Sequence, residues 1–450
     1  MSESEPSLEG LTDRRDGSEP LVEIEDLCKF FKSETGFLAS FRESPDVRAV
    51  EDVTFDIREG ETIALVGESG CGKSTLARTL LQLEQPTRGT VRFKGQDLTE
   101  MSAREIRPLR KDMMMIFQDP QSSLNPRMKV GPIVEEPMKA HDLYTPEERT
   151  ARAKELLDKV GLDPAHYGRY PHEFSGGQRQ RVNLARALST DPDLIMCDEP
   201  VSALDVSIQA QVLNTMDELQ DEFDVTYLFI SHNLSVVRYV ADRVAVMYLG
   251  HIIELAEKTE LFENPQHPYT QALLDAMPVP DPREAGTRGT LEGDVPSPID
   301  PPSGCRFRTR CPQLINPDDH PVETAALGEE LQEYLLESYE MTDREWRDVL
   351  SFTRSVRRRD FTLENADTGR DAVDRYVDRH FFEAGRPDGD VGATIGKAVG
   401  LIAEGEWGEA GELLTNTFEE TSICAAERPR YTIPSEYGDD KHQADCHLHR

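Results

Sequence analysis

The chain has 450 residues, and its 85 acidic side chains outnumber 50 basic ones, which gives a formal net charge of −35. This length exceeds one ordinary core and predicts roughly two or three domains. The negative charge argues against non-specific nucleic-acid binding, because it repels phosphate backbones. Only 12 of the basic residues are lysines, which favours adaptation to high salt, where screening removes self-repulsion. An ordinary acidic cytosolic protein is the alternative.

Composition also bounds the compartment. No apolar run approaches the ~20 residues that a membrane-spanning helix needs. The start of the chain, Met1 to Pro20, is polar and acidic rather than a signal peptide. We therefore expect a cytoplasmic chain that does not cross the membrane by itself, with a disordered acidic segment over residues 1–20. Seven cysteines are an odd number in such a setting, so a disulfide framework is not expected.

In chain order, residues 21–278 alternate short apolar runs with helical patterns, which predicts an α/β domain with a largely parallel sheet. We expect strands at Thr62–Val66, Met113–Phe117, Leu194–Cys197, Thr226–Ile230 and Val244–Tyr248. A stretch rich in Pro, Gly and acidic residues then predicts a linker within 279–314. Residues 423–450 form a final segment.

Between linker and final segment, apolar residues at helical spacing predict a small helical insertion over 315–422. These residues are Leu331, Tyr334, Leu335 and Tyr339, then Trp346, Val349 and Leu350, then Val373, Tyr376 and Val377. Such stripes usually reflect core packing, so they assign the insertion no function.

The first candidate site is a glycine-rich loop between the strand Thr62–Val66 and a helical run. The loop reads Gly67-Glu68-Ser69-Gly70-Cys71-Gly72-Lys73-Ser74-Thr75. Its glycines let backbone N–H groups curl around phosphates, while Lys73 neutralises phosphate oxygens and Ser74 offers a hydroxyl to Mg²⁺. The bare pattern arises by chance in on the order of a few per cent of chains this long. The flanking strand and helix make a phosphate-binding loop the prediction.

Two adjacent carboxylates, Asp198 and Glu199, follow the apolar strand Leu194–Cys197. In parallel sheets, ligands bind beyond the carboxyl ends of the strands. Asp198 therefore suits a role linked to Mg²⁺, and Glu199 suits polarising an attacking water. Taken alone, the pair could equally be a strand that meets a solvated turn.

Three further features accompany the loop and the carboxylates. Ser175-Gly176-Gly177-Gln178 opens a helix, Gln118 follows one strand, and His232 follows another. A Ser-Gly-Gly turn by itself is more often an ordinary loop. All five features in this order are not expected by chance. Together they resemble the ABC ATPase family over about Leu21 to Met277.

The resemblance implies a RecA-like P-loop core with a helical subdomain near 119–180. It also implies a head-to-tail dimer, in which the signature loop of one subunit covers the ATP on the phosphate loop of the other. The implied catalytic residues are Glu199, His232 in the switch loop and Gln118 in the Q-loop. The implied nucleotide contacts are Phe31, Gly67, Ser69, Gly70, Cys71, Gly72, Lys73, Ser74, Thr75, Gln118 and Asp198.

The same resemblance assigns Mg²⁺ to Ser74, Gln118 and Asp198. The signature, which acts on the partner's nucleotide, is implied at Ser175, Gly176, Gly177 and Gln178, and the D-loop at Asp205. Phe31 would stack on adenine, with Phe30 as the alternative, although a Phe pair could also be core.

Three stretches are similar to the ATPases of dipeptide, oligopeptide and nickel importers: Gln118–Met128, His267–Leu274 and the segment from Gly304 to Pro312. This resemblance implies a peripheral subunit on the cytoplasmic face of the membrane, bound to two transmembrane permeases. It further implies a second ATPase subunit, either a copy or a sister chain, an extracellular solute-binding protein that acts indirectly, and no nucleic acid. Peptides are the default cargo, with nickel or another small solute as the alternative. A soluble ABC ATPase outside transport is the remaining rival, opposed by the single phosphate loop.

The cysteines of the tail depart from the subfamily pattern. Cys305 and Cys311 are commonly followed by two more cysteines a short distance on, but here these come at Cys424 and Cys446. We therefore expect the insertion to split one motif. Four thiolates suit an iron–sulfur cluster or zinc, and the resemblance favours [4Fe–4S]. Buried cysteines without a metal are the alternative, as expected for Cys28, Cys71 and Cys197.

Overall fold

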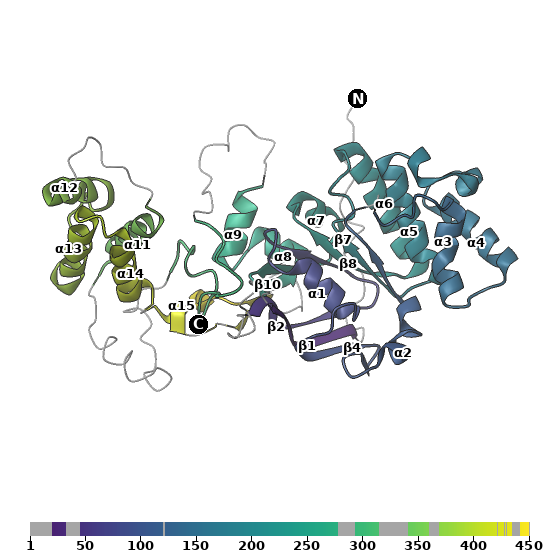
Figure 1. The fold of residues 1–450 in the computed structure, drawn as a ribbon, viewed down its shortest axis with the longest axis horizontal. Coiled ribbons are helices and arrows are strands. Elements are labelled where there is room, and N and C mark those ends of the chain that lie inside the picture. Colours follow the sequence, from purple (N-terminus) through teal and green to yellow (C-terminus); the bar gives the residue numbers. More distant parts are fainter. Residues whose placement is uncertain are drawn as a thin grey trace, which may run out of the picture. The chain divides into compact units, whose positions relative to one another are not determined.

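The structure is a computed structural model. It describes residues 20–32, 46–119, 122–277, 293–314, 341–359, 369–420, 422–426, 428, 430–433 and 442–449. The chain divides into two compact units (Figure 1), unit 1 with residues Met1–Asn264 and Pro434–His442, and unit 2 with Pro265–Ile433 and Gln443–Arg450. The N-terminal segment expected to be disordered lies outside the described residues, apart from Pro20.

A largely parallel sheet forms the centre of unit 1. Its strands are β3 (Thr62–Val66), β6 (Met113–Ile116), β7 (Leu194–Asp198), β8 (Thr226–Ser231), β9 (Arg243–Tyr248) and β10 (His251–Glu257). They follow the order β10-β9-β3-β8-β7-β6, and only β10 pairs antiparallel to its neighbour. Every residue of β3, β7, β8 and β9 is buried, as expected for strands covered on both faces. All five strands expected from the sequence are present, with bounds within one residue.

A second, antiparallel sheet packs over the helix that follows the glycine-rich loop. Its strands are β1 (Pro20–Lys32), β2 (Asp46–Arg58), β4 (Arg88–Phe93) and β5 (Gln96–Asp97), in the order β2-β1-β4-β5, and the helix is α1 (Lys73–Leu80). Ile24 and Ile57 of this sheet share one hydrophobic core with Leu76 of α1 and Leu65 of β3. The loop is therefore held between two sheets.

The remaining helices of unit 1 are α2 (Ala103–Ile106), α3 (Val130–Ala140), α4 (Pro146–Lys159), α5 (Gly176–Ala187), α6 (Val206–Phe223), α7 (Leu234–Val240) and α8 (Lys258–Glu263). Thr145 begins α4 with a capping box, since its hydroxyl accepts from the N–H of Glu148 and the carboxylate of Glu148 accepts from the N–H of Thr145. Helices α3, α4 and α5 build a second core with strands β6 and β7. No helix among the described residues is long and apolar enough to cross a membrane.

Unit 2 is mainly helical. Its elements are α9 (Pro268–Asp275), α11 (Asp343–Arg358), α12 (Arg370–Phe381), α13 (Gly389–Ala403), α14 (Trp407–Leu414), α15 (Ile423–Ala426) and the short strand β11 (Tyr431–Ile433), while β12 (His442–Ala444) crosses the division between the units. Helix α14 contacts α11 and α13, and α12 packs on α13. Trp346, Val349, Val373 and Val377 are buried in their shared core. The predicted stripe Leu331–Tyr339 lies outside the described residues.

The division between the units falls earlier than the domain boundary predicted at residue 278. Helix α9 belongs to unit 2 because its aromatic face packs on the cysteine-bearing segment. The ring centroids of Tyr269 and Phe307 lie 5.3 Å apart, and Phe307 also contacts the ring of His267. Unit 1 in turn includes residues 434–442 from the far end of the chain.

Candidate functional site

The glycine-rich loop joins β3 to α1, and two of its glycines are sterically required. Gly67 has φ +150° and Gly72 has φ +113°, conformations that other residues rarely adopt. A Cβ atom would lie 2.1 Å from the carbonyl oxygen of Met247 at Gly67, and 2.0 Å from that of Ala49 at Gly72. The loop thus passes directly against the backbones of β9 and β2, which fixes its curvature.

Lys73 is the first residue of α1, and its ammonium lies inside the loop. It donates to the carbonyl oxygens of Gly67 at 2.8 Å and Glu68 at 2.9 Å. Cys71 is buried beside it, with Sγ 3.7 Å from the ammonium nitrogen, and burial raises the pKa of the Cys71 thiol. A buried cation at a helix N-terminus is suited to a phosphate, because the first N–H groups of a helix have no partners within the helix.

Oxygen donors for a divalent cation meet next to this cation. The hydroxyl of Ser74, in α1, donates to Oδ1 of Asp198, at the end of β7, at 2.9 Å. Burial raises the pKa of the Asp198 carboxyl, although the Ser74 hydrogen bond opposes the shift. A hydroxyl and a carboxylate at this spacing are the hard oxygen ligands that Mg²⁺ prefers. The residues present therefore fit Mg²⁺.

The carboxylate of Glu199 contacts two other predicted site residues. Nε2 of Gln118 donates to its Oε2 at 2.9 Å, and Nδ1 of His232 lies 3.0 Å from its Oε1. The three residues follow β6, β7 and β8, whose carboxyl ends meet at one edge of the parallel sheet. Glu199 has φ +49°, a strained conformation for a non-glycine residue that clusters at functional sites.

The turn predicted as the signature and the loop predicted as the D-loop pack against one another. Ser175 caps α5, where it accepts from the N–H of Gln178 at 3.3 Å, and its own N–H donates to the Gln178 side chain at 3.0 Å. A Cβ at Gly177 would lie 2.3 Å from Cγ2 of Ile208, so only glycine permits this approach. Asp205 caps α6 by accepting from the N–H of Ile208 at 3.1 Å. Ser175 and Gly176 are exposed to solvent.

The remaining nucleotide candidates are also located. The Phe31 ring, near the end of β1, is 36% exposed, with the Lys29 ammonium 4.7 Å from its centroid. Phe30 is more buried than Phe31, which leaves Phe31 as the ring more open to a ligand. Ser69 and Gly70 are exposed on the loop, and Thr75 is half-buried in α1.

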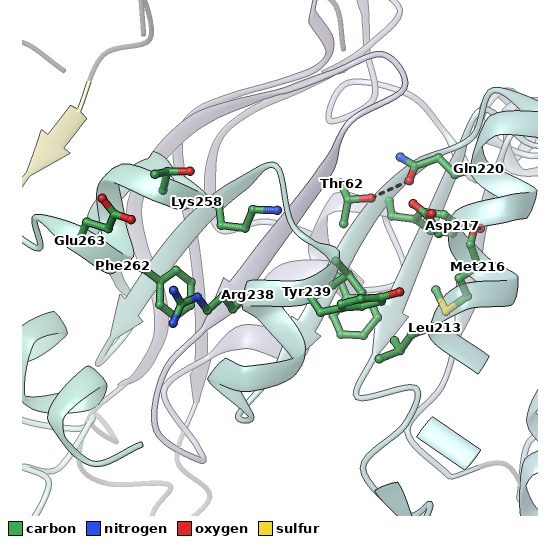
Figure 2. A pocket seen from close by; sticks show the side chains of 14 residues that line it. Thr62, Leu213, Met216, Asp217, Gln220, Arg238, Tyr239, Lys258, Phe262 and Glu263 are labelled. Carbon is green, nitrogen blue, oxygen red and sulfur yellow. Dashed lines mark hydrogen bonds between the residues drawn. The ribbon is translucent and has the colours of Figure 1, made fainter. Parts of the chain in front are cut away.

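A separate cavity of about 300 Å³ lies in unit 1 (Figure 2). It is lined by Thr62, Leu213, Met216, Asp217, Gln220, Tyr227, Phe229, Arg238, Tyr239, Val240, Lys258, Thr259, Phe262 and Glu263. Thr62 begins β3, whereas the phosphate loop follows the other end of that strand. Five residues of strand span roughly 16 Å. The cavity is therefore distinct from the candidate nucleotide site.

The four tail cysteines come together in unit 2. The backbone N–H of Cys305 donates to the carbonyl oxygen of Cys424 at 2.8 Å. Burial raises the pKa values of Cys305 and Cys311, and the neighbouring Cys424 and Cys446 raise them further. Among the described residues, however, no three or more His, Cys, Asp or Glu side chains form a group that could hold a metal ion.

A histidine lies beside these cysteines, and the sequence analysis did not predict a functional role for it. His267 is 1% exposed, and its Nδ1 accepts from the N–H of Tyr269 at 3.0 Å. In the neutral ring this bond leaves the hydrogen on Nε2, which lies 4.0 Å from Sγ of Cys305. The sequence offered one signal for this role. His267 and Pro268 begin α9, and a histidine that caps a helix next to a cysteine-bearing loop can also contact a cysteine.

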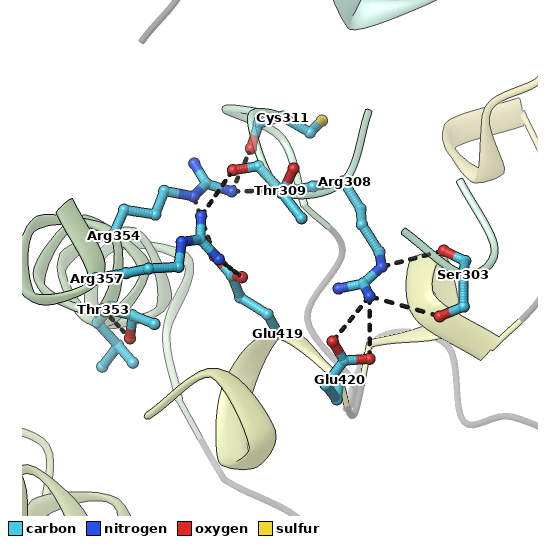
Figure 3. A network of polar contacts seen from close by, with 10 residues as sticks. Ser303, Arg308, Thr309, Cys311, Thr353, Arg354, Arg357, Glu419 and Glu420 are labelled. Carbon is cyan, nitrogen blue, oxygen red and sulfur yellow. Dashed lines mark hydrogen bonds and ion pairs between the residues drawn. The ribbon is translucent and has the colours of Figure 1, made fainter. Parts of the chain in front are cut away.

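Arginines also contact the cysteine-bearing loop (Figure 3). Nη2 of Arg354 donates to the carbonyl oxygen of Cys311 at 2.8 Å.

Near Cys446, burial raises the pKa of Asp445 to about 6, although the adjacent Arg428 opposes this shift. The cysteines thus lie in a polar, arginine-rich environment that local sequence patterns did not indicate.

Comparison with known proteins settles the family. The ABC transporter family profile matches residues 50–202. The oligopeptide transport ATP-binding protein AppF of Bacillus subtilis is 54% identical over 297 residues, which cover 65% of this chain and 90% of that protein. This chain belongs to the ABC transporter ATP-binding family. The predicted RecA-like ABC ATPase fold is therefore confirmed, and ATP hydrolysis is the activity of this family.

Further profiles, a second relative and a solved structure also match parts of this chain. The profile of the oligopeptide/dipeptide transporter C-terminal region matches residues 253–316, and a domain of unknown function, DUF8228, matches 343–437. The putative oligopeptide transport ATP-binding protein YkfD of Bacillus subtilis is 52% identical over 299 residues, which cover 66% of this chain and 88% of that protein. The solved structure of cbiO1 from Clostridium perfringens, part of the ABC transporter complex cbiONQ, is 26% identical with a TM-score of 0.48 and covers 55% of this chain and 92% of that one.

Proposed function

We propose that this ABC ATPase hydrolyses MgATP to power the import of di- or oligopeptides. The observation that carries the catalytic assignment is the contact of Gln118 and His232 with the two oxygens of Glu199. The cargo assignment is supported by the oligopeptide/dipeptide profile and by the relatives named as oligopeptide transport proteins.

The residues divide the chemistry among themselves. Lys73 and the N-terminus of α1 bind the phosphates, and Phe31 stacks on adenine. Ser74, Asp198 and Gln118 hold Mg²⁺, which neutralises charge on the phosphate oxygens when bound. Glu199 accepts the hydrogen bond that orients and polarises the attacking water. His232 fixes the rotamer of Glu199 from the switch loop.

The remaining contacts come from a second subunit in a head-to-tail dimer. The exposed turn that begins at Ser175 and Gly176 covers the nucleotide of the partner, and Asp205 lies beside it in the D-loop. The packing of Gly177 on Ile208 makes the signature and the D-loop move as one body. The partner is either a second copy of this chain or a sister ATPase.

The assembly we propose sits on the cytoplasmic face of the membrane. Two transmembrane permeases bind the ATPase dimer, and an extracellular solute-binding protein delivers the cargo to them. No nucleic acid takes part, consistent with the net charge of −35. We also infer adaptation to high salt from that charge.

The tail cysteines are proposed to hold a [4Fe–4S] cluster. The proximity of Cys305 and Cys311 to Cys424 and Cys446 supports a shared site, and the resemblance to peptide-importer ATPases favours the cubane cluster over zinc. Cys305, Cys311, Cys424 and Cys446 are all required, because thiolates supply the ligands of a cubane cluster.

Affinity purification from native membranes tests the transport assignment. We expect permeases, a solute-binding protein and any sister ATPase to co-purify. In liposomes with these partners, ATP hydrolysis should drive uptake of labelled di- or tripeptides and not of nickel ions. Uptake of nickel alone would select the alternative importer, and the absence of any permease would favour a soluble ABC ATPase outside transport.

A further inference from the structure

The loop that carries Cys305 and Cys311 is bound by α11, the first helix of the insertion among the described residues (Figure 3). Nη2 of Arg354, in α11, donates to the carbonyl oxygen of Cys311 at 2.8 Å and to that of Arg308 at 3.3 Å. One turn further, Nη2 of Arg357 donates to the carbonyl oxygen of Thr309 at 3.1 Å. Two guanidinium groups therefore hold three carbonyl groups of one short loop.

Both arginines are fixed by a single buried carboxylate. The side chain of Glu419 is 0% exposed, and its two oxygens lie 3.3 Å from Nε of Arg354 and 2.5 Å from Nη1 of Arg357. A carboxylate is tolerated at such burial only when it is paired. The neighbouring Glu420 accepts from Nη2 of Arg308 with both oxygens, at 2.8 Å and 3.0 Å.

The same segment leads into the second pair of cysteines. Ser303 donates through its hydroxyl to the carbonyl oxygen of Ala425 at 2.9 Å, beside the bond between Cys305 and Cys424. Gly304 has φ +61°, and a Cβ there would lie 2.4 Å from the carbonyl oxygen of Cys424. The end of the insertion and the loop before it thus meet backbone to backbone.

We propose that the insertion is a clamp that holds the two halves of the cysteine site together, with Glu419 and Arg354 as its positioning residues. Separating the halves by a long segment adds only a slowly growing entropy cost, and the buried ion pairs and carbonyl contacts offset it. The proposal gives a role to the region matched by the domain of unknown function. It rests on the proposed cysteine site and is independent of the transported cargo.

Anaerobically purified full-length protein tests the clamp with Glu419→Gln, and with Glu409→Gln on the exposed face of α14 as the matched control. Loss of the buried carboxylate should lower iron per chain and speed alkylation of Cys311 in the metal-free protein by at least about tenfold. The tenfold factor follows from hydrogen bonds to charged groups worth about 1.5–3 kcal/mol. The control should match wild type.

A second variant covers the case in which Glu419→Gln unfolds the insertion. Arg354→Lys keeps the charge beside Glu419 but cannot reach both carbonyl oxygens, so alkylation should accelerate at Cys311 and remain unchanged at Cys197. Wild-type thiol reactivity in both variants would overturn the clamp. If wild-type protein holds no metal, the cluster proposal fails while the alkylation rates still decide the clamp.

The cavity of Figure 2 supports a second, independent inference. Its wall is largely apolar, with Met216, Tyr227 and Phe229 among the lining residues. The lining also includes two cations, the half-buried Lys258 and the exposed Arg238. Lys258 begins α8 with its amine directed toward the middle of the lining in this view, and the Arg238 guanidinium lies 5.6 Å from the centroid of Phe262.

Among the described residues, no ion pair joins Lys258 or Arg238 to a carboxylate, although the exposed Asp217 and Glu263 also line the cavity. This is informative because acidic residues outnumber basic ones 85 to 50, so partners are abundant. A half-buried ammonium next to an apolar surface is suited to an anion that carries an apolar group. The volume of about 300 Å³ lies at the lower end of known ligand sites.

We infer that this cavity binds a small monocarboxylate with an apolar body. The carboxylate would lie at Lys258, and the hydrocarbon would pack on Met216 and Phe229. Because the cavity is separate from the phosphate loop, such a ligand does not compete with ATP.

Titration calorimetry with N-acetylphenylalanine and its neutral amide tests this site. Wild type should bind the acid saturably and at least about tenfold more tightly than the amide, since one charge-assisted hydrogen bond is worth about 1.5–3 kcal/mol. Lys258→Met should lose this preference, whereas the exposed control Lys397→Met should retain it. No saturable binding of the acid, or equal binding to Lys258→Met and wild type, would refute the site.

Discussion

Nδ1 of His232 lies 3.0 Å from Oε1 of Glu199, and Gln118 donates to the other oxygen of the same carboxylate. Both carboxylate oxygens of Glu199 are therefore in contact with side chains at one edge of the sheet. The oxygens of Ser74 and Asp198 lie next to them. A carboxylate held in this way has a defined direction for polarising a water.

The first prediction concerns Glu199→Gln. The amide keeps the shape and the hydrogen bond to Gln118 or His232 but cannot polarise water, so turnover should fall by about 10²–10⁴-fold with nucleotide binding retained. A closed, ATP-loaded dimer should then accumulate on size-exclusion chromatography. Steady-state hydrolysis at the wild-type rate in this variant would show that another residue is the base.

The second prediction separates binding from chemistry. Lys73→Ala removes the buried ammonium that the loop carbonyls surround, so ATP affinity itself should fall along with turnover. Equilibrium binding of a fluorescent ATP analogue measures this directly. Glu199→Gln is the matched comparison, because it should bind the same analogue with wild-type affinity.

The third prediction rests on a fully buried histidine that the sequence analysis did not select. Nε2 of His442 lies 2.7 Å from Glu254, and Nδ1 lies 3.3 Å from Glu260. Burial alone would lower the pKa of His442, but the two glutamates outweigh it and raise the pKa. The imidazolium thus anchors the far end of the chain to β10 and α8 within unit 1.

Because the folded-state pKa of His442 is raised, its stabilisation is fully present below the unfolded pKa of about 6.5 and is lost as pH rises through the folded value. His442→Gln should destabilise unit 1 by about 3–5 kcal/mol near pH 6, and the difference from wild type should shrink near pH 9. Urea unfolding at both pH values measures this. The exposed control His172→Gln should show no such pH-dependent difference.

The fourth prediction tests the salt adaptation. If repulsion among 85 acidic side chains limits stability in dilute buffer, screening in molar KCl should raise the melting temperature. Thermal melts at the two salt concentrations suffice. An equal or lower melting temperature in molar KCl would contradict the adaptation.

The fifth prediction concerns the cysteine site. Protein purified without oxygen should be brown, absorb broadly near the visible–ultraviolet boundary and contain about four irons per chain. Zinc in place of iron would refute the cluster while keeping a metal site. If neither metal is present, the cysteines are packing residues.

Local patterns in the sequence determined the central strands, the phosphate loop and the carboxylates Asp198 and Glu199 that were predicted to act with it. This was possible because apolar periodicity is set by burial on both faces of a parallel sheet. The glycines of the loop were likewise predictable, because its backbone conformation is one that few other residues adopt. The helical nature of the insertion followed from the same kind of periodicity.

Only the tertiary structure decided which distant polar groups meet. Nothing local in the sequence pairs Arg354 with Glu419, His442 with Glu254, or His267 with Cys305. Periodicity reports whether a side chain faces the core, whereas a buried charge chooses its partner from any part of the chain that folding brings near, because burial makes an unpaired charge costly. The roles of these residues therefore became visible only once the segments that carry them were packed together.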